Sequence, residues 1–274
     1  MPCFADISIT LDVFSHAYSI LNPPMPSVQI RFYEELNDFL AAELRKVTFT
    51  HELTRRTSVK DLIESFGVPH TEVEIILANG RSVDFSYIVQ AGDRISVYPV
   101  FESLDITPLL RLREKPLRDP RFVVDANLGK LARYLRMLGF DAVYRNDYTD
   151  RQVAQIASRE KRIVLTRDRA LLQYKIITHG YFVRAVKPHE QVREILTRLD
   201  LYNALRPFTR CLRCNGELGS VEKQAVIEHL EPKTKLYYDS FRRCRSCGQT
   251  YWKGSHFERM EKLYAHLSTP PRTT

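Results

Sequence analysis

Three aspartates stand where an apolar run of the sequence meets a helical pattern. Asp125 follows the run "RFVV", Asp168 follows "RIVL" after two residues, and Asp150 opens a helical pattern between them. If the runs are parallel strands, the loops at their carboxyl ends converge on one crevice, where Asp147 or Asp141 could join the three. Crowded carboxylates repel one another unless a hard cation neutralises them. The pattern therefore predicts a Mg²⁺ or Mn²⁺ site suited to cleaving phosphodiesters.

Each aspartate also has a purely structural alternative. Asp125 and Asp150 could be helix N-caps, Asp168 could cap a turn, and Asp141 could be a solvated loop residue. Two aspartates at strand ends in a strongly basic region favour the metal site over capping.

Two C-x-x-C pairs are the strongest local signal. The pairs are "CLRC" and "CRSC", formed by Cys211, Cys214, Cys244 and Cys247. Pairs of this kind predict four thiolates around a structural zinc ion in a zinc ribbon, and Gly248 permits a turn beneath the metal. Two disulfides are the alternative, which a reducing compartment disfavours. Cys3 stands apart from both pairs.

Length and composition indicate a globular chain of several domains. The chain has 274 residues, of which 44% are apolar, so it is long for one domain and can bury a substantial core. The first 27 residues lack a basic start followed by a long apolar run, and no apolar stretch reaches the ~20 residues that cross a bilayer. We therefore expect a cytoplasmic protein that does not enter a membrane.

The net charge of +8 is distributed unevenly along the chain. Residues 1–110 contain 8 Lys or Arg against 15 Asp or Glu, whereas residues 111–274 contain 33 against 18. A basic region of this size attracts phosphate backbones, so RNA is the expected partner. A merely solubilising surface is the alternative.

The basic and aromatic residues nearest the two chemical motifs are the candidate RNA contacts. Aromatic residues beside a zinc site are also expected as its small hydrophobic core, and His256 could instead form a structural hydrogen bond. The predicted RNA contacts are Lys130, Arg133, Arg136, Arg167, Arg169, Arg213, Arg243, Arg245, Trp252 and His256.

Strand and helix patterns alternate through the central part of the chain. Apolar runs at 121–124, 142–145, 162–165 and 181–186 predict strands, and each is followed by a helical pattern or a loop. Gly139 supplies a natural end to the first helix. The alternation predicts a parallel sheet with helices on its faces over residues 121–205, followed by the zinc ribbon over residues 206–264.

The preceding segment has a different pattern. Residues 28–102 combine strands, one short helix "SVKDLIESFG" and a hairpin at Asn79-Gly80, a favoured two-residue turn. The segment resembles the ubiquitin-like β-grasp of small sulfur carriers, especially in "AGDRISVYPVF". Such carriers end in Gly-Gly, whereas "PVFESLD" continues here, so a docking or regulatory role with a protein partner is expected. Residues 103–120, rich in proline and basic residues, are predicted as a linker.

Several motifs in order resemble one family. "FVVDANLGKLARYLRMLGFDA", "RIVLTRDRALL", the two cysteine pairs and "YWKGSH" resemble the Mut7-C family, a PIN-like nuclease domain fused to a zinc ribbon. The resemblance covers about residues 120–262, and the preceding segment looks like the ubiquitin-like module often joined to that domain. It implies an α/β architecture of three parts: a β-grasp domain, a PIN-like parallel-sheet domain and a zinc ribbon.

The resemblance also implies a chemistry. PIN-like domains are typically metal-dependent ribonucleases, which assigns Asp125, Asp150 and Asp168 to metal binding. The usual PIN set has a further acid on the helix after the first position, but residues 126–140 contain none, so Asp147 is the predicted substitute beside Asp141.

Two functions are consistent with these observations. The first is a metal-dependent ribonuclease acting on a structured RNA, with tRNA as the leading candidate and the zinc ribbon assisting binding. The second is a non-catalytic RNA-binding or ribosome-associated adaptor. In either case, the acidic first domain could cover the basic crevice and restrain it.

Overall fold

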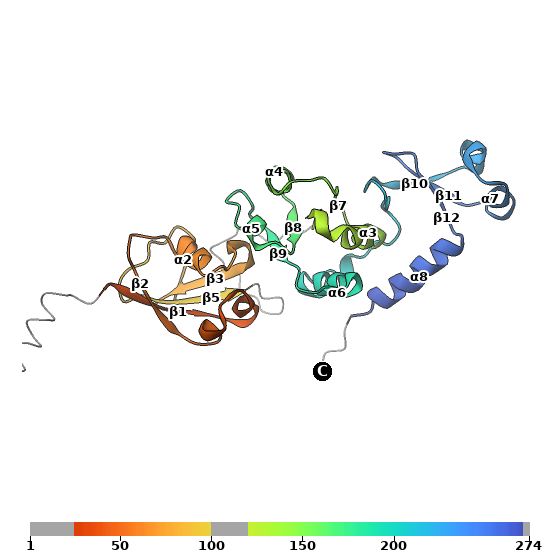
Figure 1. Ribbon diagram of the computed structural model, residues 1–274. Coiled ribbons are helices and arrows are strands. Elements are labelled where there is room, and N and C mark those ends of the chain that lie inside the picture. Colours follow the sequence, from red (N-terminus) through yellow and green to blue (C-terminus); the bar gives the residue numbers. More distant parts are fainter. Residues whose placement is uncertain (1–24, 100–119, 271–274) are drawn as a thin grey trace, which may run out of the picture.

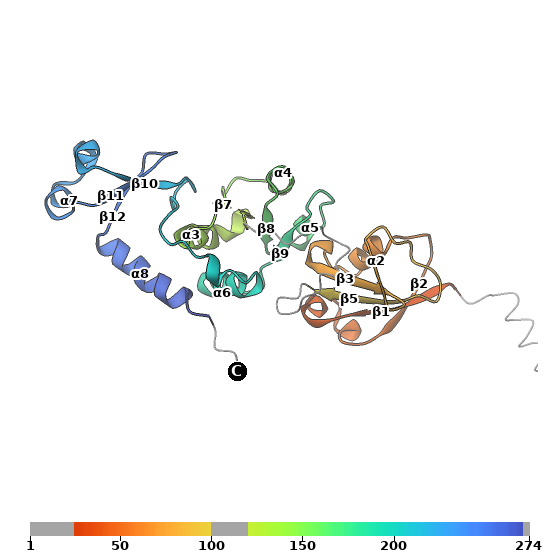
Figure 2. The ribbon, with the colours of Figure 1, turned by 180° about the vertical axis from the view of Figure 1, so that it is seen from behind.

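Three sheets follow one another along the chain. The computed structural model describes residues 25–99 and 120–270, and it places a five-stranded, a four-stranded and a three-stranded sheet in succession (Figures 1 and 2). The predicted linker, residues 103–120, lies outside the described residues except for its last position, and Cys3 lies outside them too. The predicted α/β architecture of three parts is confirmed.

The first sheet has the strand order of a ubiquitin-like fold, β2-β1-β5-β3-β4. Its central pair, β1 and β5, is parallel and the other pairs are antiparallel. Asn79 and Gly80 turn the β3–β4 hairpin with φ values of 50° and 78°, as the favoured turn requires. The elements are β1 (Ser27–Phe32), η1 (Glu34–Phe39), η2 (Ala42–Leu44), β2 (Phe49–Glu52), α2 (Val59–Ser65), η3 (His70–Glu72), β3 (Val73–Ala78), β4 (Arg81–Val83) and β5 (Arg94–Pro99).

The central sheet is wholly parallel, with strand order β7-β6-β8-β9. The predicted strands and helices are all present, although β9 is shorter than its apolar run. Gly139 ends α3 with φ of +98°, and the carbonyl of Arg206 packs so closely against it that a side chain would clash. The elements are β6 (Phe122–Val124), η5 (Ala126–Leu128), α3 (Gly129–Met137), β7 (Ala142–Val143), α4 (Asp150–Glu160), β8 (Ile163–Thr166), α5 (Arg169–Leu172), β9 (Gly180–Phe182) and α6 (Pro188–Arg198).

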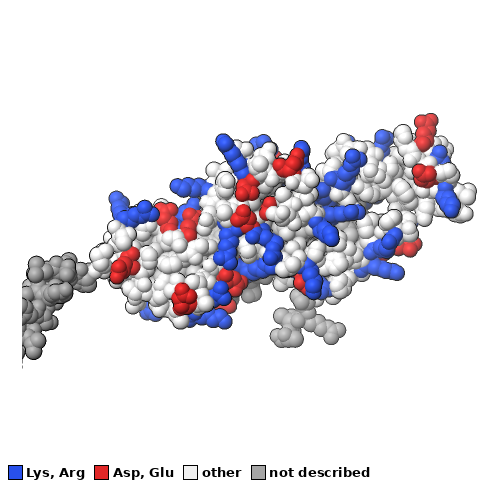
Figure 3. All heavy atoms as spheres, in the orientation of Figure 1, with Lys and Arg blue, Asp and Glu red and all other residues white. Residues whose placement is uncertain are grey.

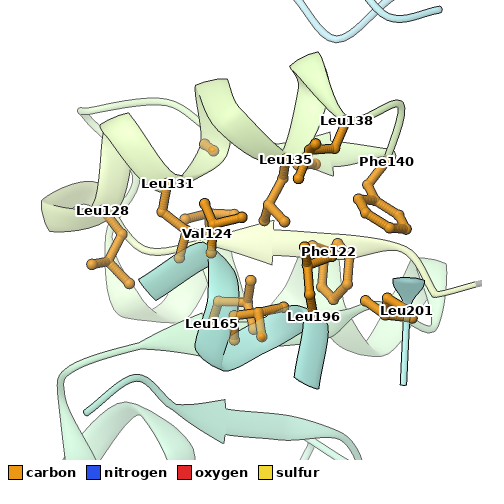
Figure 4. Packing of buried hydrophobic residues seen from close by; sticks show 14 of the residues in the cluster. Phe122, Val124, Leu128, Leu131, Leu135, Leu138, Phe140, Leu165, Leu196 and Leu201 are labelled. Carbon is orange, nitrogen blue, oxygen red and sulfur yellow. The ribbon is translucent and has the colours of Figure 1, made fainter. Parts of the chain in front are cut away.

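Successive side chains of β6 point to opposite faces of the central sheet and pack into a separate hydrophobic core on each face. Phe122 and Val124 pack with leucines of α3 and α6 on one face (Figure 4). Val123 points to the other face, where it packs with Val153 of α4 and Leu171 of α5. Burial on both faces explains why the strands read as continuous apolar runs. The rigid three-layer arrangement fixes the loops at the carboxyl edge of the sheet.

The third sheet is antiparallel and is followed by a helix that returns to the central domain. The helix α8 runs back beneath the ribbon to α6, where Leu267 is fully buried (Figure 1). No helix in the described ranges is long and apolar enough to cross a membrane. The elements are η6 (Tyr202–Ala204), β10 (Leu218–Val221), η7 (Lys223–Ala225), η8 (Ile227–His229), α7 (Pro232–Tyr237), β11 (Phe241–Cys244), β12 (Thr250–Trp252) and α8 (Ser255–Leu267).

The ubiquitin-like domain docks on β9, the edge strand of the central sheet. The N–H of Phe182 donates to Glu72 Oε1 at 2.5 Å, and His70 Nε2 lies 2.9 Å from the carbonyl oxygen of Ile177. Arg184 donates to both Glu72 and Asp38 at 3.1 Å. Burial raises the pKa of Glu72, and the charge of Arg184 opposes that rise. The acidic first domain therefore makes charged, buried contacts with the basic central domain.

Candidate active site and zinc site

Asp125 and Asp168 meet at the carboxyl edge of the central sheet. They follow the adjacent parallel strands β6 and β8, and the N–H of Asp125 donates to the carbonyl of Leu165 at 3.0 Å. The buried hydroxyl of Thr166 donates to Asp125 Oδ2 at 2.7 Å and accepts from the N–H of Asp168 at 2.9 Å. One hydroxyl thus joins the two predicted positions. Thr166 was not among the predicted site residues, although its hydroxyl stands at the end of the predicted strand.

Asp150 approaches the same edge from α4. The capping box of this helix is formed by Thr149 and Gln152, so Asp150 occupies the first turn without serving as the cap. Partial burial and the negative charges of Asp168 and Asp125 raise the pKa of Asp150. Asp150 therefore lies close enough to Asp168 and Asp125 for their charges to repel its own.

The capping alternative fits one of the three aspartates. Asp168 Oδ1 accepts from the N–H of Ala170 at 2.8 Å and caps α5. Asp125 precedes η5 but makes no side-chain cap bond, and its side chain is 6% exposed. A buried carboxylate needs a hydrogen-bond partner, and the hydroxyl of Thr166 is one for Asp125.

The carboxylates of the acidic edge lie farther apart than the ligands of a closed metal site. Asp147 and Asp141, the candidates for a fourth acid, both bind other side chains. Among the described residues, only the four cysteines gather three or more potential ligand atoms within 4.8 Å of one another. Asp147 is exposed and pairs with Arg145 at 2.7 Å. Asp141 is bound by Arg162 at 2.7 Å and by Asn215 at 2.6 Å. Both of these aspartates are therefore engaged by other side chains.

The ten predicted RNA contacts differ in how far their side chains bind other parts of the protein. On α3, Lys130 and Arg133 are exposed and line one cavity. Arg167 instead donates to the carbonyls of residues 183–185, and Arg169 donates to the carbonyls of Asp38 and Phe39 in the first domain. Both arginines beside Asp168 are exposed and also support the protein structure through these bonds, and their contact with RNA stays a prediction.

Arg136 is buried and structural. Only 4% of it is exposed, and its guanidinium donates to the carbonyls of Ala142, Leu212 and Arg213. It lies four positions after Ala132, on the side of α3 that borders the apolar stripe. Its carbonyl contacts fix the first cysteine pair against the central domain, so Arg136 is not available to a phosphate.

The four cysteines form a compact tetrad. Cys211 Sγ lies 3.6 Å from Cys247 Sγ, and Cys214 Sγ lies 3.4 Å from Cys244 Sγ. These separations exceed a disulfide bond of about 2.05 Å. They are close to the spacing of about 3.8 Å that four sulfurs adopt at 2.3 Å from a tetrahedral ion. The cluster could therefore hold zinc, and the disulfide alternative is wrong.

The two cysteine pairs share one backbone geometry. The N–H of Cys211 donates to the carbonyl of Gly216, and that of Asn215 donates to the carbonyl of Cys211; Cys244, Gly248 and Gln249 repeat this pattern. Asn215 and Gly248 both have φ of 71°. Asparagine tolerates this left-handed conformation, so the first pair turns without glycine at that position.

The ribbon aromatics divide between core and surface. Phe241 is buried, and the hydroxyl of Tyr251 lies 3.1 Å from Cys211 Sγ. Burial alone would raise the pKa of Cys211, but hydrogen bonds from Tyr251 and from backbone N–H groups lower it to about 7. Trp252 remains 37% exposed. The other predicted ribbon contacts, Arg213, Arg243, Arg245 and His256, are also exposed.

Fold and site together define a class: an α/β domain with carboxylates at the edge of a parallel sheet, joined to a four-cysteine ribbon and a ubiquitin-like domain. Residues 120–264 match the family model of the Mut7-C RNAse domain, and residues 25–105 match that of Mut7-C ubiquitin. The chain therefore belongs to the Mut7-C RNAse domain family, and the predicted resemblance is confirmed. The match supports nuclease activity. No curated protein and no solved structure matches the chain.

Proposed function

We propose that the central domain is a Mg²⁺- or Mn²⁺-dependent ribonuclease that hydrolyses phosphodiester bonds of a structured RNA such as tRNA. The observation that carries the proposal is the pair Asp125 and Asp168, joined through Thr166, together with the repulsion that both exert on Asp150. Zinc in the cysteine tetrad would be structural, because four sulfurs leave no ligand position for substrate.

The donor set fits a hard divalent ion. Asp125, Asp150 and Asp168 offer carboxylate oxygens, the ligands that Mg²⁺ and Mn²⁺ prefer. A bound ion would neutralise their repulsion and supply Lewis-acid activation of a water for attack on phosphorus. Asp147 lies outside this proposed set because its carboxylate is paired with Arg145.

The remaining residues orient the reacting groups. Thr166 holds the carboxylate of Asp125 in one rotamer through its hydrogen bond, so the second oxygen keeps a fixed direction. Lys130 and Arg133 extend from the helix that follows Asp125, where their charges can hold the phosphates that flank the cleaved bond. These residues supply binding and orientation, whereas the carboxylates hold the cation.

Substitution of Asp125 tests the catalytic proposal. We expect Asp125→Asn to abolish manganese-dependent cleavage of a total-RNA pool, because a neutral amide is a poor ligand for a hard cation. RNA affinity should be unchanged or tighter, because the substitution removes a negative charge. The measurements are gel-resolved cleavage, circular dichroism and RNA binding without divalent ions. Asp200→Asn, at an exposed aspartate of the same domain, is the control and should cleave like the wild type.

A non-catalytic RNA-binding adaptor is the second candidate. The capping role of Asp168 and the absence of an acid in residues 126–140 favour it. If the wild-type protein supplied with Mn²⁺ leaves every RNA of the pool intact while binding it, the adaptor is the correct assignment.

A further inference from the structure

We propose that a groove between the zinc ribbon and α8 binds an unpaired stretch of RNA, with a base stacked on Trp252. The inference rests on the proposed RNA substrate and specifies which part of it is recognised. It assigns the ribbon and the C-terminal helix a joint binding site, separate from the acidic edge.

The groove has the dimensions and lining of a nucleotide site. It encloses about 470 Å³, within the range of small-molecule pockets. Ring contacts build its floor: Phe208 lies 4.7 Å from Phe257 and 6.1 Å from Tyr264, measured between centroids. Trp252 forms part of the wall and keeps 37% of its surface exposed. An exposed indole beside an aromatic floor provides the flat, sequence-tolerant surface on which unpaired bases stack.

The charge of the rim favours a nucleic acid. Lys253 lines the groove, together with Arg210 and Arg242, whose guanidiniums also donate to backbone carbonyls, against a single acid, Glu261. Lys253 is exposed, and its Nζ lies 5.7 Å from the ring centroid of Phe257, next to the stacking surface. Basic side chains beside aromatic rings are the combination that holds the backbone and the bases of a single strand together.

A second cavity lies beside the groove, against α3, the helix that follows Asp125. This cavity encloses about 280 Å³ and is lined by Lys130 and Arg133 of α3. The two cavities are neighbours, because Leu212 and Met260 line both of them. The helix α3 is joined by a single 3-10 turn to Asp125. We infer that a strand bound across both cavities would run along α3 towards the proposed cation site.

An unpaired strand fits these two cavities better than a duplex. A base enters an aromatic groove only after leaving its own stack, which single strands, loops and ends allow at low cost. The flanking basic side chains contact the backbone and impose little sequence preference. The substrate class is therefore a structured RNA with an unpaired segment, and the ribbon recognises that segment.

The intrinsic fluorescence of Trp252 tests the proposal directly, because it is the one tryptophan of the chain. The full-length, zinc-loaded Asp125→Asn protein is titrated with a short oligouridylate and with a blunt RNA duplex, without added Mg²⁺ or Mn²⁺. We expect stacking to quench the emission with oligouridylate and to leave it unchanged with the duplex. Equal quenching by both RNAs, or by neither, would overturn the proposal.

Binding of the same labelled oligouridylate, followed by anisotropy, gives a second readout. In the same background, Trp252→Ala should weaken the affinity about tenfold, the effect of losing one stacked base. Tyr237→Ala removes an aromatic ring that is 71% exposed on α7, outside the groove, and should leave affinity unchanged. Lys253→Glu should weaken binding more than Lys233→Glu, which makes the same charge change on α7. Equal effects within each matched pair would contradict the groove.

The two proposals can fail separately. A protein whose Trp252 is quenched by oligouridylate but which cleaves no RNA keeps the groove and loses the nuclease. A protein that cleaves RNA without any quenching keeps the nuclease and loses the groove. Zinc content and circular dichroism of each variant establish that the ribbon remains folded.

Discussion

A single hydroxyl organises the acidic edge. Thr166 is fully buried, and it links the side chain of Asp125 to the backbone of Asp168 across two neighbouring strands. Asp150 adds a third negative charge from another element, without a capping role of its own. The three charges are costly together in the absence of a cation, and that cost gives a measurable prediction for Asp150.

Asp150→Asn should stabilise the metal-free protein and weaken its response to manganese. Partial burial and the charges of Asp168 and Asp125 raise the pKa of Asp150 above 3.8. The stability that the neutral carboxyl of Asp150 contributes is therefore full below pH 3.8 and is lost as pH rises through the raised pKa. At neutral pH the charged carboxylate therefore lowers the free energy of unfolding. The gain should be below about 1 kcal/mol, because solvent screens this largely exposed group.

Thermal unfolding of the zinc-loaded protein, with and without Mn²⁺, measures both effects. We expect Mn²⁺ to raise the melting temperature of the wild type and to raise that of the variant much less. Asp200→Asn should respond to Mn²⁺ as the wild type does. Equal shifts in wild type and Asp150→Asn would show that Asp150 takes no part in cation binding.

Residue positions along the sequence predicted the acidic edge but not the partners of each side chain. The alternation of strands and helices was sufficient to bring Asp125 and Asp168 to one edge. It could not show that Arg136 is buried or that Arg169 contacts the first domain, because those contacts join segments far apart in the chain. Basic residues near an acidic motif are therefore ambiguous until their neighbours in space are known.

At the scale of elements, the ribbon is attached to the central domain by polar contacts at its first cysteine pair. Asp141 accepts from Arg162 and from Asn215, the residue that follows Cys214. Asn215 in turn accepts from the N–H of Ala142 at 3.0 Å through its side-chain oxygen. The zinc site and the central sheet are thus positioned by one hydrogen-bonded network.

Asp141→Ala should destabilise the protein by about 3 kcal/mol, because it leaves the largely buried Arg162 with only Glu160 as a charged partner. Burial raises the pKa of Asp141, but hydrogen bonds from Arg162 and Asn215 outweigh it and lower the pKa below 3.8. The carboxylate therefore stabilises the fold above pH 3.8, and this contribution is lost as pH falls through the lowered pKa.

Urea unfolding at several pH values checks this prediction. The difference between wild type and variant should be full at neutral pH and should shrink in acid. Asp239→Ala, which removes an 88% exposed carboxylate paired with Lys223, should cost less than about 1 kcal/mol. A similar cost for the two variants would show that the junction contributes little.

The elements themselves were largely predictable, with one omission. Hydrophobic periodicity located the strands of both larger sheets, and the cysteine spacing located the ribbon. The helix α8 was missed, although Met260, Leu263, Tyr264 and Leu267 repeat with helical spacing. The apolar face of α8 is narrow, and it packs on the core of the central domain, which is a different domain from the ribbon that precedes it. The cysteine pattern of the ribbon therefore gives no sign of this helix.

At the scale of the whole molecule, acidic and basic domains are joined through their charges. Figure 3 shows basic side chains gathered where the first and central domains meet. Asp38 and Glu72 pair with Arg184, and Glu35 pairs with Arg198. The acidic residues of the first domain thus pair with basic residues of the central domain, as the uneven distribution of charge along the sequence allows. That the acidic domain covers the basic crevice stays a prediction, and the arginines that this domain contacts are Arg169, Arg184 and Arg198.

Opening this interface should increase RNA affinity at low salt. Glu72→Arg places a buried positive charge beside Arg184, so the domains should separate and free Arg184 and Arg169 from their contacts with the first domain. We expect a larger radius of gyration by X-ray scattering and tighter RNA binding without divalent ions. Glu43→Arg makes the same change of charge at an exposed position of η2 and controls for the overall field. Equal affinities of the two variants would argue against a covering role.

The contact of Glu72 with the N–H of Phe182 has a consequence for solubility. Any strand at the margin of a sheet presents unpaired backbone groups that a second molecule can extend. In this chain the ubiquitin-like domain packs against β9, and the carboxylate of Glu72 takes the N–H of Phe182 that a further strand would otherwise bind. We therefore expect a central domain produced without the acidic domain to expose β9 as a template for intermolecular β-pairing.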